Sequence, residues 1–363
     1  MKTEASSRGG ASTYDMIVFC HLRWDFVYQR PQHILSRLSK EYKILVVEEP
    51  VHFESMKKST FEIREINSQI HVCQPHVSDM EEIGPYLKKH LKNTVFSVGW
   101  FYSAAFVSVL DTLECETVVY DCMDELTLFK GASQKLVDQE NLLLSAADVV
   151  YTGGKSLYES KKLKHHNVFC FPSSVDIAHF SGAKDKVSTM PEDLKGISTP
   201  IVGYYGVIDE RIDLRLLKNA AAKSPNYSFV MIGPICKIEE SDLPRAKNIH
   251  YLGMKSYEEL PNYLQYFDVA MMPFALNDST KFISPTKTLE YMAAGKPIIS
   301  TRIKDVERDY SDCVMLVNSS DEFTLALKFP MQNFEEKYKS ILEKTSWNAT
   351  VEKMNSMIKK VIA

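Results

Sequence analysis

Short apolar runs that alternate with amphipathic stretches constrain the fold of this chain more than any other feature. Runs such as Met16 to Cys20 (MIVFC) and Thr117 to Tyr120 (TVVY) show no regular polar alternation. Such runs are typical of strands buried on both faces of a parallel sheet. Between them lie amphipathic segments with helical spacing, for example Ser133 to Ala146. Strands and helices that alternate along a chain predict an α/β fold with parallel sheets.

The alternation breaks once, which divides the chain into two parts. Residues 181–199 contain Gly, Lys, Asp, Ser and Pro with little apolar periodicity, a composition that indicates an interdomain linker. Strands resume after Pro200 with IVGYYG. We therefore expect two Rossmann-like domains, at 14–180 and 200–345. A chain of 363 residues is long enough for two cores.

Composition and the polar N-terminus narrow the class of protein further. Lys plus Arg number 43 against 47 Asp plus Glu, so no general affinity for nucleic acid is expected. The seven cysteines are odd in number and form no C-x-x-C pair, which favours reduced thiols over disulfides or zinc. Residues 1–13 resemble a disordered tail rather than a signal peptide. No stretch approaches the roughly 20 apolar residues of a membrane span, so we expect a soluble, cytoplasmic protein.

The segment HLRWDFVYQR, at 21–30, follows the first predicted strand directly. Ligands of open parallel sheets bind beyond the carboxyl ends of the strands, so segments in such positions are candidate sites. Arg30 and the following helix start could hold an anion, and Trp24 and Tyr28 could stack on a sugar or base. Equally, the aromatic residues could pack at a domain interface, with the charges solvated. The candidate ligand residues here are His21, Arg23, Trp24 and Arg30.

The segment YDCMDE, at 120–125, also follows a predicted strand. Asp121 and Asp124 are close enough in sequence to share a site. Carboxylates in this position can bind sugar hydroxyls or act as a base. The alternative is that one of them caps the next helical segment.

The segment YYGVIDER, at 204–211, ends the first strand of the second domain. Gly203 and Gly206 allow a ligand to approach the backbone closely, and Arg211 could reach a diphosphate with its fork of donors. A plain strand-to-helix turn with a solvated arginine explains the same residues, and without further information it is the preferred interpretation.

The most informative segment is FALNDSTKFISPTKTLEYMAAGKP, at 274–297. Its Ser-Pro-Thr sequence predicts a helix start, at which the backbone N–H groups of Thr286, Lys287 and Thr288 would face an anion. Lys287 adds a full charge. Glu290 lies one turn further on much the same face, where a carboxylate suits a ribose diol. An ordinary capped helix with an ion pair is the alternative.

At these residues the chain resembles a known family. SPTKTLEYMAAGKPIIST is similar to the C-terminal signature of retaining glycosyltransferases of the GT-B fold. RPQHILSRL, VVYDCMDEL, ADVVYTGGKSLYE, FPSSVD and GVIDERIDL resemble a bacterial branch often encoded near cell-surface polysaccharide genes. The resemblance covers nearly the whole chain. It implies two Rossmann-like domains that face each other across a cleft, with a helix at 346–363 that crosses back to the first domain.

The resemblance also implies roles for individual residues. Thr286 and Lys287 would bind the diphosphate of a UDP- or GDP-linked sugar, Glu290 its ribose, and Arg211 would approach the phosphates. We assign Gly206 and Thr288 to the same donor site, and His21, Arg23, Trp24 and Arg30 to the acceptor side. Lys287 and Arg211 would stabilise the leaving diphosphate, and Asp121 and Asp124 would serve the acceptor. No obligatory metal is expected.

One departure from the family pattern concerns the donor sugar. The family has two glutamates eight positions apart, of which Glu290 matches the second, whereas Phe282 occupies the first position. The first glutamate usually contacts the sugar, so Asn277, Asp278 or backbone groups would have to replace it.

The expected activity is therefore hexosyl transfer to a carbohydrate or lipid-linked acceptor, with peripheral membrane contact. Alternatives are a sugar-nucleotide epimerase or hydrolase on the same fold, and a non-catalytic scaffold that binds nucleotide or glycan.

Overall fold

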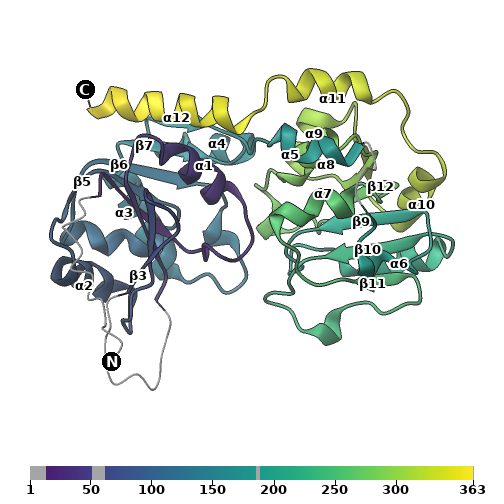
Figure 1. The fold of residues 1–363 in the computed structure, drawn as a ribbon, viewed down its shortest axis with the longest axis horizontal. Helices are drawn as coiled ribbons and strands as arrows, with labels where there is room; N and C mark the ends of the chain where they lie inside the picture. The colour runs from purple at the N-terminus through teal and green to yellow at the C-terminus, as the bar shows by residue number, and fades with distance from the viewer. Residues whose placement is uncertain (1–13, 51–61, 185–188, 363) are drawn as a thin grey trace, which may run out of the picture.

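The computed structural model describes residues 14–50, 62–184 and 189–362, and it places two α/β domains side by side (Figure 1). The first domain holds an eight-stranded sheet of order β3-β4-β2-β1-β5-β6-β7-β8. Its strands are β1 (Met16–Cys20), β2 (Ile44–Glu48), β3 (Ile63–Glu65), β4 (Ile70–Cys73), β5 (Val95–Phe101), β6 (Glu114–Cys122), β7 (Val149–Thr152) and β8 (Val168–Cys170). All neighbouring strands are parallel except β3 and β4.

The second domain holds a six-stranded parallel sheet of order β11-β10-β9-β12-β13-β14. Its strands are β9 (Ile201–Tyr205), β10 (Ser228–Ile232), β11 (Ile249–Tyr251), β12 (Val269–Met272), β13 (Ile298–Thr301) and β14 (Met315–Val317). The central strands β1, β9 and β10 are buried at every residue. Apolar runs without alternation form such strands because both faces of the sheet are covered by helices.

Helices connect the strands and cover the sheets. They are α1 (Arg30–Leu38), α2 (Ile83–His90), α3 (Gln134–Ala146), α4 (Lys155–Lys161), α5 (Ile177–Ser181), α6 (Leu214–Lys223), α7 (Leu260–Leu264), α8 (Lys287–Ala293), α9 (Lys304–Tyr310), α10 (Ser320–Lys328), α11 (Glu335–Leu342) and α12 (Trp347–Ile362). The local sequence determines where some helices begin. The side chain of Ser133 accepts a hydrogen bond from the backbone N–H of Leu136 and caps α3, and the side chain of Asp213 accepts one from Leu216 and caps α6.

The predicted α/β fold is confirmed: the apolar run Met16 to Cys20 forms β1, the run Thr117 to Tyr120 lies within β6, and the IVGYYG segment contains β9. The strands β3, β4, β8 and β14 were not predicted; three of them, β3, β8 and β14, lie at the edges of their sheets and are only partly buried. The predicted tail at 1–13 lies outside the described residues.

The chain joins the second domain earlier than the sequence suggested. Val175, Phe180, Ala183 and Leu194 are buried in the hydrophobic core of the second domain, so the described residues on both sides of 185–188 contribute to that core instead of forming a separate linker. The apolar residues are spread too thinly there to show periodicity.

The last helix, α12, returns to the first domain and packs against α1 and β6 (Figure 1). Trp347, Val351, Met354 and Ile358 are buried in the same cluster as the residues of β1 and β2. The hydroxyl of Tyr151, in β7, donates to the carbonyl of Met354 at 2.8 Å.

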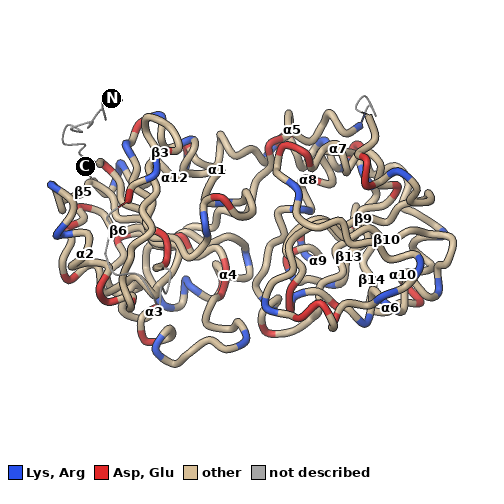
Figure 2. Tube along the Cα trace, turned by 60° about the horizontal axis from the view of Figure 1, so that its bottom comes forward, with Lys and Arg blue, Asp and Glu red and all other residues tan. Residues whose placement is uncertain are grey.

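Acidic and basic residues are interspersed over both domains (Figure 2), in keeping with a formal net charge of −4. Within the described ranges, no helix is both long and apolar enough to cross a membrane.

Candidate functional site

A pocket lies between the two domains, near the carboxyl ends of the central strands of both sheets. Residues that follow β1, β6 and β8 line it on one side, and residues that follow β9, β10 and β12 line it on the other. The first domain contributes Tyr28, Gln29, Arg30, Met123, Asp124 and Ser173, and the second contributes Gly206, Arg211, Tyr257, Thr286, Lys287 and Glu290 among others. Predicted donor-side residues from two separate segments thus meet in one pocket.

Lys287, the first residue of α8, is the central cation of the second-domain wall. Its Nζ lies 5.5 Å from the ring centroid of Tyr204 and 6.0 Å from that of Phe274. Burial lowers the pKa of Lys287 to about 8, an effect that nearby Glu290 opposes. Lys287 is therefore mostly protonated at neutral pH, yet its ammonium makes no hydrogen bond or ion pair with any residue the structure describes. A partly buried cation in this state favours an anionic ligand.

Gly206 makes room for Lys287. A Cβ atom at Gly206 would lie 2.3 Å from Cε of Lys287, and the φ angle of Gly206 is +132°. Any other residue would be strained at this φ and would displace the lysine side chain. Gly206 therefore contributes to the predicted site by leaving room for the lysine side chain, and not by binding the ligand itself.

Glu290 lines the pocket close to Lys287 and is 7% exposed. The hydroxyl of Tyr205 donates to Oε2 of Glu290 at 2.7 Å. Burial raises the pKa of Glu290, whereas the Tyr205 hydrogen bond and Lys287 both act to lower it. Tyr205 therefore fixes one oxygen of the carboxylate. It ends a buried strand, so its sequence position gave no sign of this role.

Arg211 is held in place by Asp209. Its Nη2 donates to Oδ2 of Asp209 at 2.7 Å and its Nε to Oδ1 at 3.0 Å. The guanidinium also lies 5.8 Å from the ring centroid of Phe129, which belongs to the first domain. Arg211 lines the pocket, and two of its guanidinium nitrogens already donate to Asp209. Its positive charge is therefore held in a fixed orientation.

The two threonines of the predicted helix start differ. Thr286 precedes α8 and lines the pocket. Thr288 is fully buried. Its backbone N–H donates a hydrogen bond to the carbonyl of Pro285 at 3.1 Å, and its hydroxyl donates to the sulfur of Met272. The prediction that its backbone N–H faces an anion is therefore wrong, because the chain turns tightly at Pro285 and uses this donor internally.

On the first-domain wall, Arg30 and Asp121 form a buried ion pair. Nε and Nη2 of Arg30 donate to Asp121, at 2.8 Å from Nη2 to Oδ1, and Nη1 donates to the carbonyl of Phe171 at 2.7 Å. Arg30 is 3% exposed and Asp121 is fully buried. Strand β6 continues through Asp121, which places its side chain inside the domain. Asp121 thus has a structural role, and the predicted shared site with Asp124 is wrong.

Asp124 does line the pocket, opposite the second domain. Burial raises the pKa of Asp124, and Arg211 on the other wall opposes this rise. Of the two acids predicted to act together, Asp124 is the one that faces a ligand space.

His21, Arg23 and Trp24 do not appear among the described residues that line the pocket. Arg23 donates to the Glu48 carboxylate at 3.3 Å and to the carbonyl of Glu49. The backbone N–H of Trp24 donates to Glu48 at 2.7 Å, and its ring packs against the core. Burial lowers the pKa of His21 to about 4. This segment is therefore tied to the end of β2, a partner that its own sequence could not reveal.

Aromatic residues join the two walls. The ring of Tyr28 stacks on Tyr257 with centroids 4.6 Å apart, and Tyr257 also stacks on His179 at 4.2 Å. The interface interpretation of the aromatic residues is therefore confirmed for Tyr28. Tyr257 begins the 3-10 helix η7 (Tyr257–Glu259) and was not singled out from the sequence, where it reads as an ordinary helical position.

Asn277, one of the residues considered as a substitute for the missing glutamate, has a structural role. Asn277 accepts a hydrogen bond from Thr280 N and caps the 3-10 helix η8 (Asp278–Thr280). Phe282 packs against the apolar core of the first domain. Its position therefore contributes to the domain interface, and an acid there would face that core rather than the pocket.

Comparisons with known proteins agree with this architecture. Residues 199–332 match the family model described as "Glycosyl transferases group 1". A protein of Bacillus subtilis (strain 168), named "Putative teichuronic acid biosynthesis glycosyltransferase TuaH", is 22% identical over 276 residues, which are 69% of this chain and 68% of that protein.

Two solved structures share the fold. Sucrose-phosphate synthase from Thermosynechococcus elongatus superposes with a TM-score of 0.71 at 13% identity, covering 95% of this chain and 98% of that one. The structure described as "Trehalose-6-phosphate from E. coli bound with UDP-2-fluoro glucose" gives 0.68 at 12% identity, with the same coverage. The predicted GT-B fold is confirmed.

Proposed function

We propose that this chain, whose residues 199–332 match the model of the group 1 glycosyl transferases, moves a sugar from a nucleotide diphosphate sugar to a carbohydrate or lipid-linked acceptor. The observation that carries the proposal is the state of Lys287. It is a protonated, partly buried cation that forms no hydrogen bond or ion pair with any described residue, and Gly206 leaves room for its side chain at the pocket. A diphosphate would supply the missing negative charge.

Transfer breaks the bond between the anomeric carbon and the diphosphate oxygen, and the electron pair leaves with the diphosphate. The acceptor oxygen bonds to the anomeric carbon and gives its proton to the Asp124 carboxylate. Lys287 and Arg211 stabilise the charge that develops on the leaving group, since both cations are already oriented before the reaction. Glu290, held by Tyr205, accepts hydrogen bonds from the ribose hydroxyls.

The acceptor approaches from the first domain in this proposal. Asp124 is the acid on that wall, and burial makes its carboxylate a stronger proton acceptor. It binds acceptor hydroxyls within reach of the anomeric carbon.

The nature of the donor and acceptor is proposed from the relatives. The E. coli structure is described with a UDP sugar, which supports a UDP-linked donor over a GDP-linked one. The Bacillus subtilis relative is named for teichuronic acid biosynthesis, which supports a role in cell-surface polysaccharide synthesis. We propose retention of anomeric configuration from the family resemblance. We also propose a cytoplasmic location, with lipid-linked acceptors reached at the inner membrane face; the seven unpaired cysteines fit a reducing compartment.

Calorimetry with UDP and GDP, followed by a product assay with the corresponding sugar nucleotides and glycan acceptors, tests the proposal. The enzyme should bind at least one nucleoside diphosphate and form a glycoside. Binding without a product would indicate the scaffold alternative, and release of free sugar without acceptor would indicate a hydrolase. Failure of every nucleoside diphosphate to bind would overturn the proposal.

A further inference from the structure

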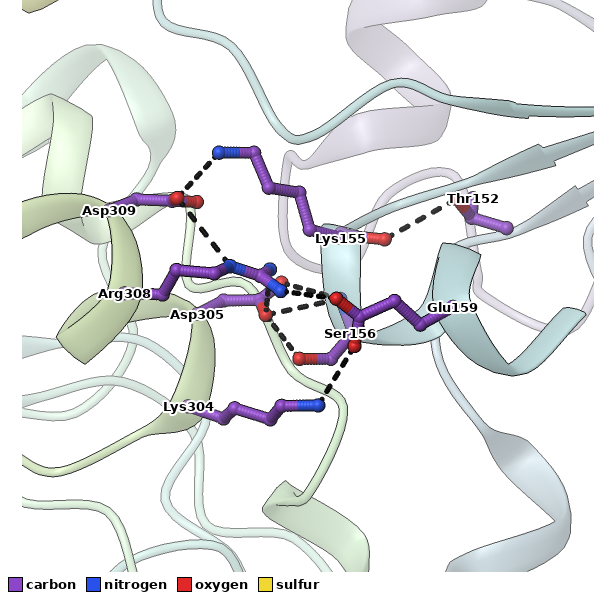
Figure 3. Close-up of polar contacts among 9 residues, drawn as sticks. Thr152, Lys155, Ser156, Glu159, Lys304, Asp305, Arg308 and Asp309 are labelled. Atoms are coloured by element: carbon purple, nitrogen blue, oxygen red, sulfur yellow. Dashed lines mark hydrogen bonds and ion pairs between the residues drawn. The ribbon is translucent and has the colours of Figure 1, made fainter. Parts of the chain in front are cut away.

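A second contact between the domains lies beside the pocket, where α4 of the first domain meets α9 of the second (Figure 3). At its centre, the backbone N–H of Ser156 donates to Oδ1 of Asp305 at 3.1 Å, and the Ser156 hydroxyl donates to the same oxygen. Asp305 is 2% exposed and Ser156 is 1% exposed. These two residues come from different domains and are 149 positions apart.

The first turn of α4 depends on this contact. Gly154 precedes the helix and has no side chain with which to satisfy the free N–H groups. Asp305 takes the place of the capping side chain, although it belongs to the other domain. Separating the domains would leave the N–H of Ser156 without its acceptor and would deprive the buried Asp305 of two donors, a costly change.

Gly154 also brings this contact to the edge of the pocket. A Cβ atom on Gly154 would lie 2.6 Å from Oδ2 of Asp305 and 2.9 Å from Cβ of Ser284. Ser284 lines the pocket and lies three residues before Lys287. The backbone of the first domain thus touches the segment from which the central cation projects.

Ion pairs surround the buried contact but are open to solvent. Glu159 pairs with Lys304 at 2.9 Å and with Arg308 at 2.8 Å, and the side chains of Glu159 and Lys304 are 46% and 56% exposed. Exposed pairs of this kind contribute little. Arg308, on the same helix α9, also donates to Asp305 at 2.6 Å, so the second domain itself supplies a counter-charge to the buried carboxylate.

We propose that Gly154, Ser156 and Asp305 form an interdomain pivot that positions the start of α8 against the first-domain wall, and that Asp305 is a positioning residue for sugar transfer. This rests on the proposed glycosyltransferase function. The pivot touches the cation-bearing segment directly, so it sets the distance between donor and acceptor walls. The proposed donor residues Lys287, Glu290 and Arg211 all belong to the second domain. A disturbed pivot would therefore shift them together relative to the first-domain wall, and the affinity for nucleotide should change little.

The test compares four variants in two assays: the affinity for the nucleoside diphosphate and the kcat and KM of transfer. Asp305→Ala, Ser156→Ala and Gly154→Ala disturb the pivot, and Glu159→Gln is the matched control at the exposed rim of the same contact. We expect kcat to fall at least tenfold in Asp305→Ala and Gly154→Ala, and less in Ser156→Ala, which keeps the backbone hydrogen bond. The Kd for the nucleoside diphosphate should change less than twofold. Glu159→Gln should stay within twofold in both assays.

A fifth variant, Ser156→Thr, keeps the hydroxyl and should retain most of the activity that Ser156→Ala loses. Gly154→Ala keeps every polar group of the pivot and adds one methyl group. It therefore tests whether the relative position of the two domains matters, even if Asp305→Ala does not fold. Equal losses of kcat and nucleotide affinity would overturn the pivot, as would normal transfer by folded Gly154→Ala. Wild-type protein that binds no nucleoside diphosphate would instead contradict the proposed function.

Discussion

The two walls of the interdomain pocket carry similar charged residues in very different states. On the first-domain wall, Arg30 is surrounded by its own protein partners, with Asp121 opposite two of its nitrogens and the Phe171 carbonyl on the third. On the second-domain wall, Lys287 has no ion-pair partner among the described residues. Both cations follow a strand and lie at a helix start. The position of a charged residue therefore identifies a candidate for the site, whereas the presence or absence of a protein counter-charge decides whether it stabilises the fold or binds a ligand.

The strongest way to test this contrast is to break the structural pair. Asp121→Ala leaves Arg30 buried without a counter-ion, so we expect a loss of about 3–5 kcal/mol in the free energy of unfolding of the first domain. Denaturant unfolding monitored by circular dichroism measures it. The exposed pair Lys223–Asp321 provides the control, and Asp321→Ala should cost less than about 1 kcal/mol. A stable Asp121→Ala protein with impaired ligand binding would place this pair in the site instead.

The converse experiment removes the unpaired cation. Lys287→Ala should weaken nucleoside diphosphate binding by about 1.5–3 kcal/mol, the range for a hydrogen bond to a charged group. Binding of the nucleoside without phosphates should change little, and calorimetry measures both. Lys223→Ala is the control on an exposed surface. Equal losses for both ligands would make Lys287 a structural residue like Arg30.

Only part of this contrast could be predicted from the sequence. The fold could be predicted because the pattern of apolar residues is a local property. The second-domain wall could be predicted because Thr286, Lys287 and Glu290 lie together at one short helix start. The first-domain wall could not, because its charges find partners far along the chain. Arg30 and Asp121 are 91 positions apart, and the sequence around either residue does not indicate that the other is its partner. Tyr205 was missed for a related reason: its hydroxyl acts at the end of a strand that otherwise looks entirely apolar.

Glu290, on the second-domain wall, combines both states: Tyr205 donates a hydrogen bond to its carboxylate, and Glu290 still lines the pocket. Glu290→Gln should weaken ribonucleotide binding by about 1 kcal/mol more than binding of the 2′- or 3′-deoxy analogues, because the deoxy ligands lack a hydrogen bond to lose. Competition binding with the three ligands measures the difference. An identical penalty for all of them would remove Glu290 from the ribose.

The smallest expected effect concerns the unliganded protein. The folded pKa of Lys287 is about 8, below its ordinary value of 10.5, so between these pH values the unfolded chain holds a proton that the folded chain lacks. The stability contribution of Lys287 therefore rises with pH across this window, and at neutral pH its charge is unfavourable. Lys287→Met should stabilise the unliganded protein at pH 7 by on the order of 1 kcal/mol.

Thermal unfolding of Lys287→Met and wild type at pH 7 and pH 10 measures this gain, which should shrink at the higher pH. Destabilisation at pH 7 would mean that the lysine already has a counter-ion in the unliganded protein, and the contrast with Arg30 would disappear.

The return of α12 to the first domain has a consequence for how the protein is made. A ribosome delivers the strands of the first domain early, but the helix that buries Trp347 and Met354 against them leaves it only after the whole second domain. Domains generally fold as units in the order of synthesis, and here the first domain emerges with an uncovered apolar face. A chaperone or transient intrachain contact would have to shield that face until translation reaches the last helix. The second domain, whose strands are contiguous in the chain, can complete its fold first.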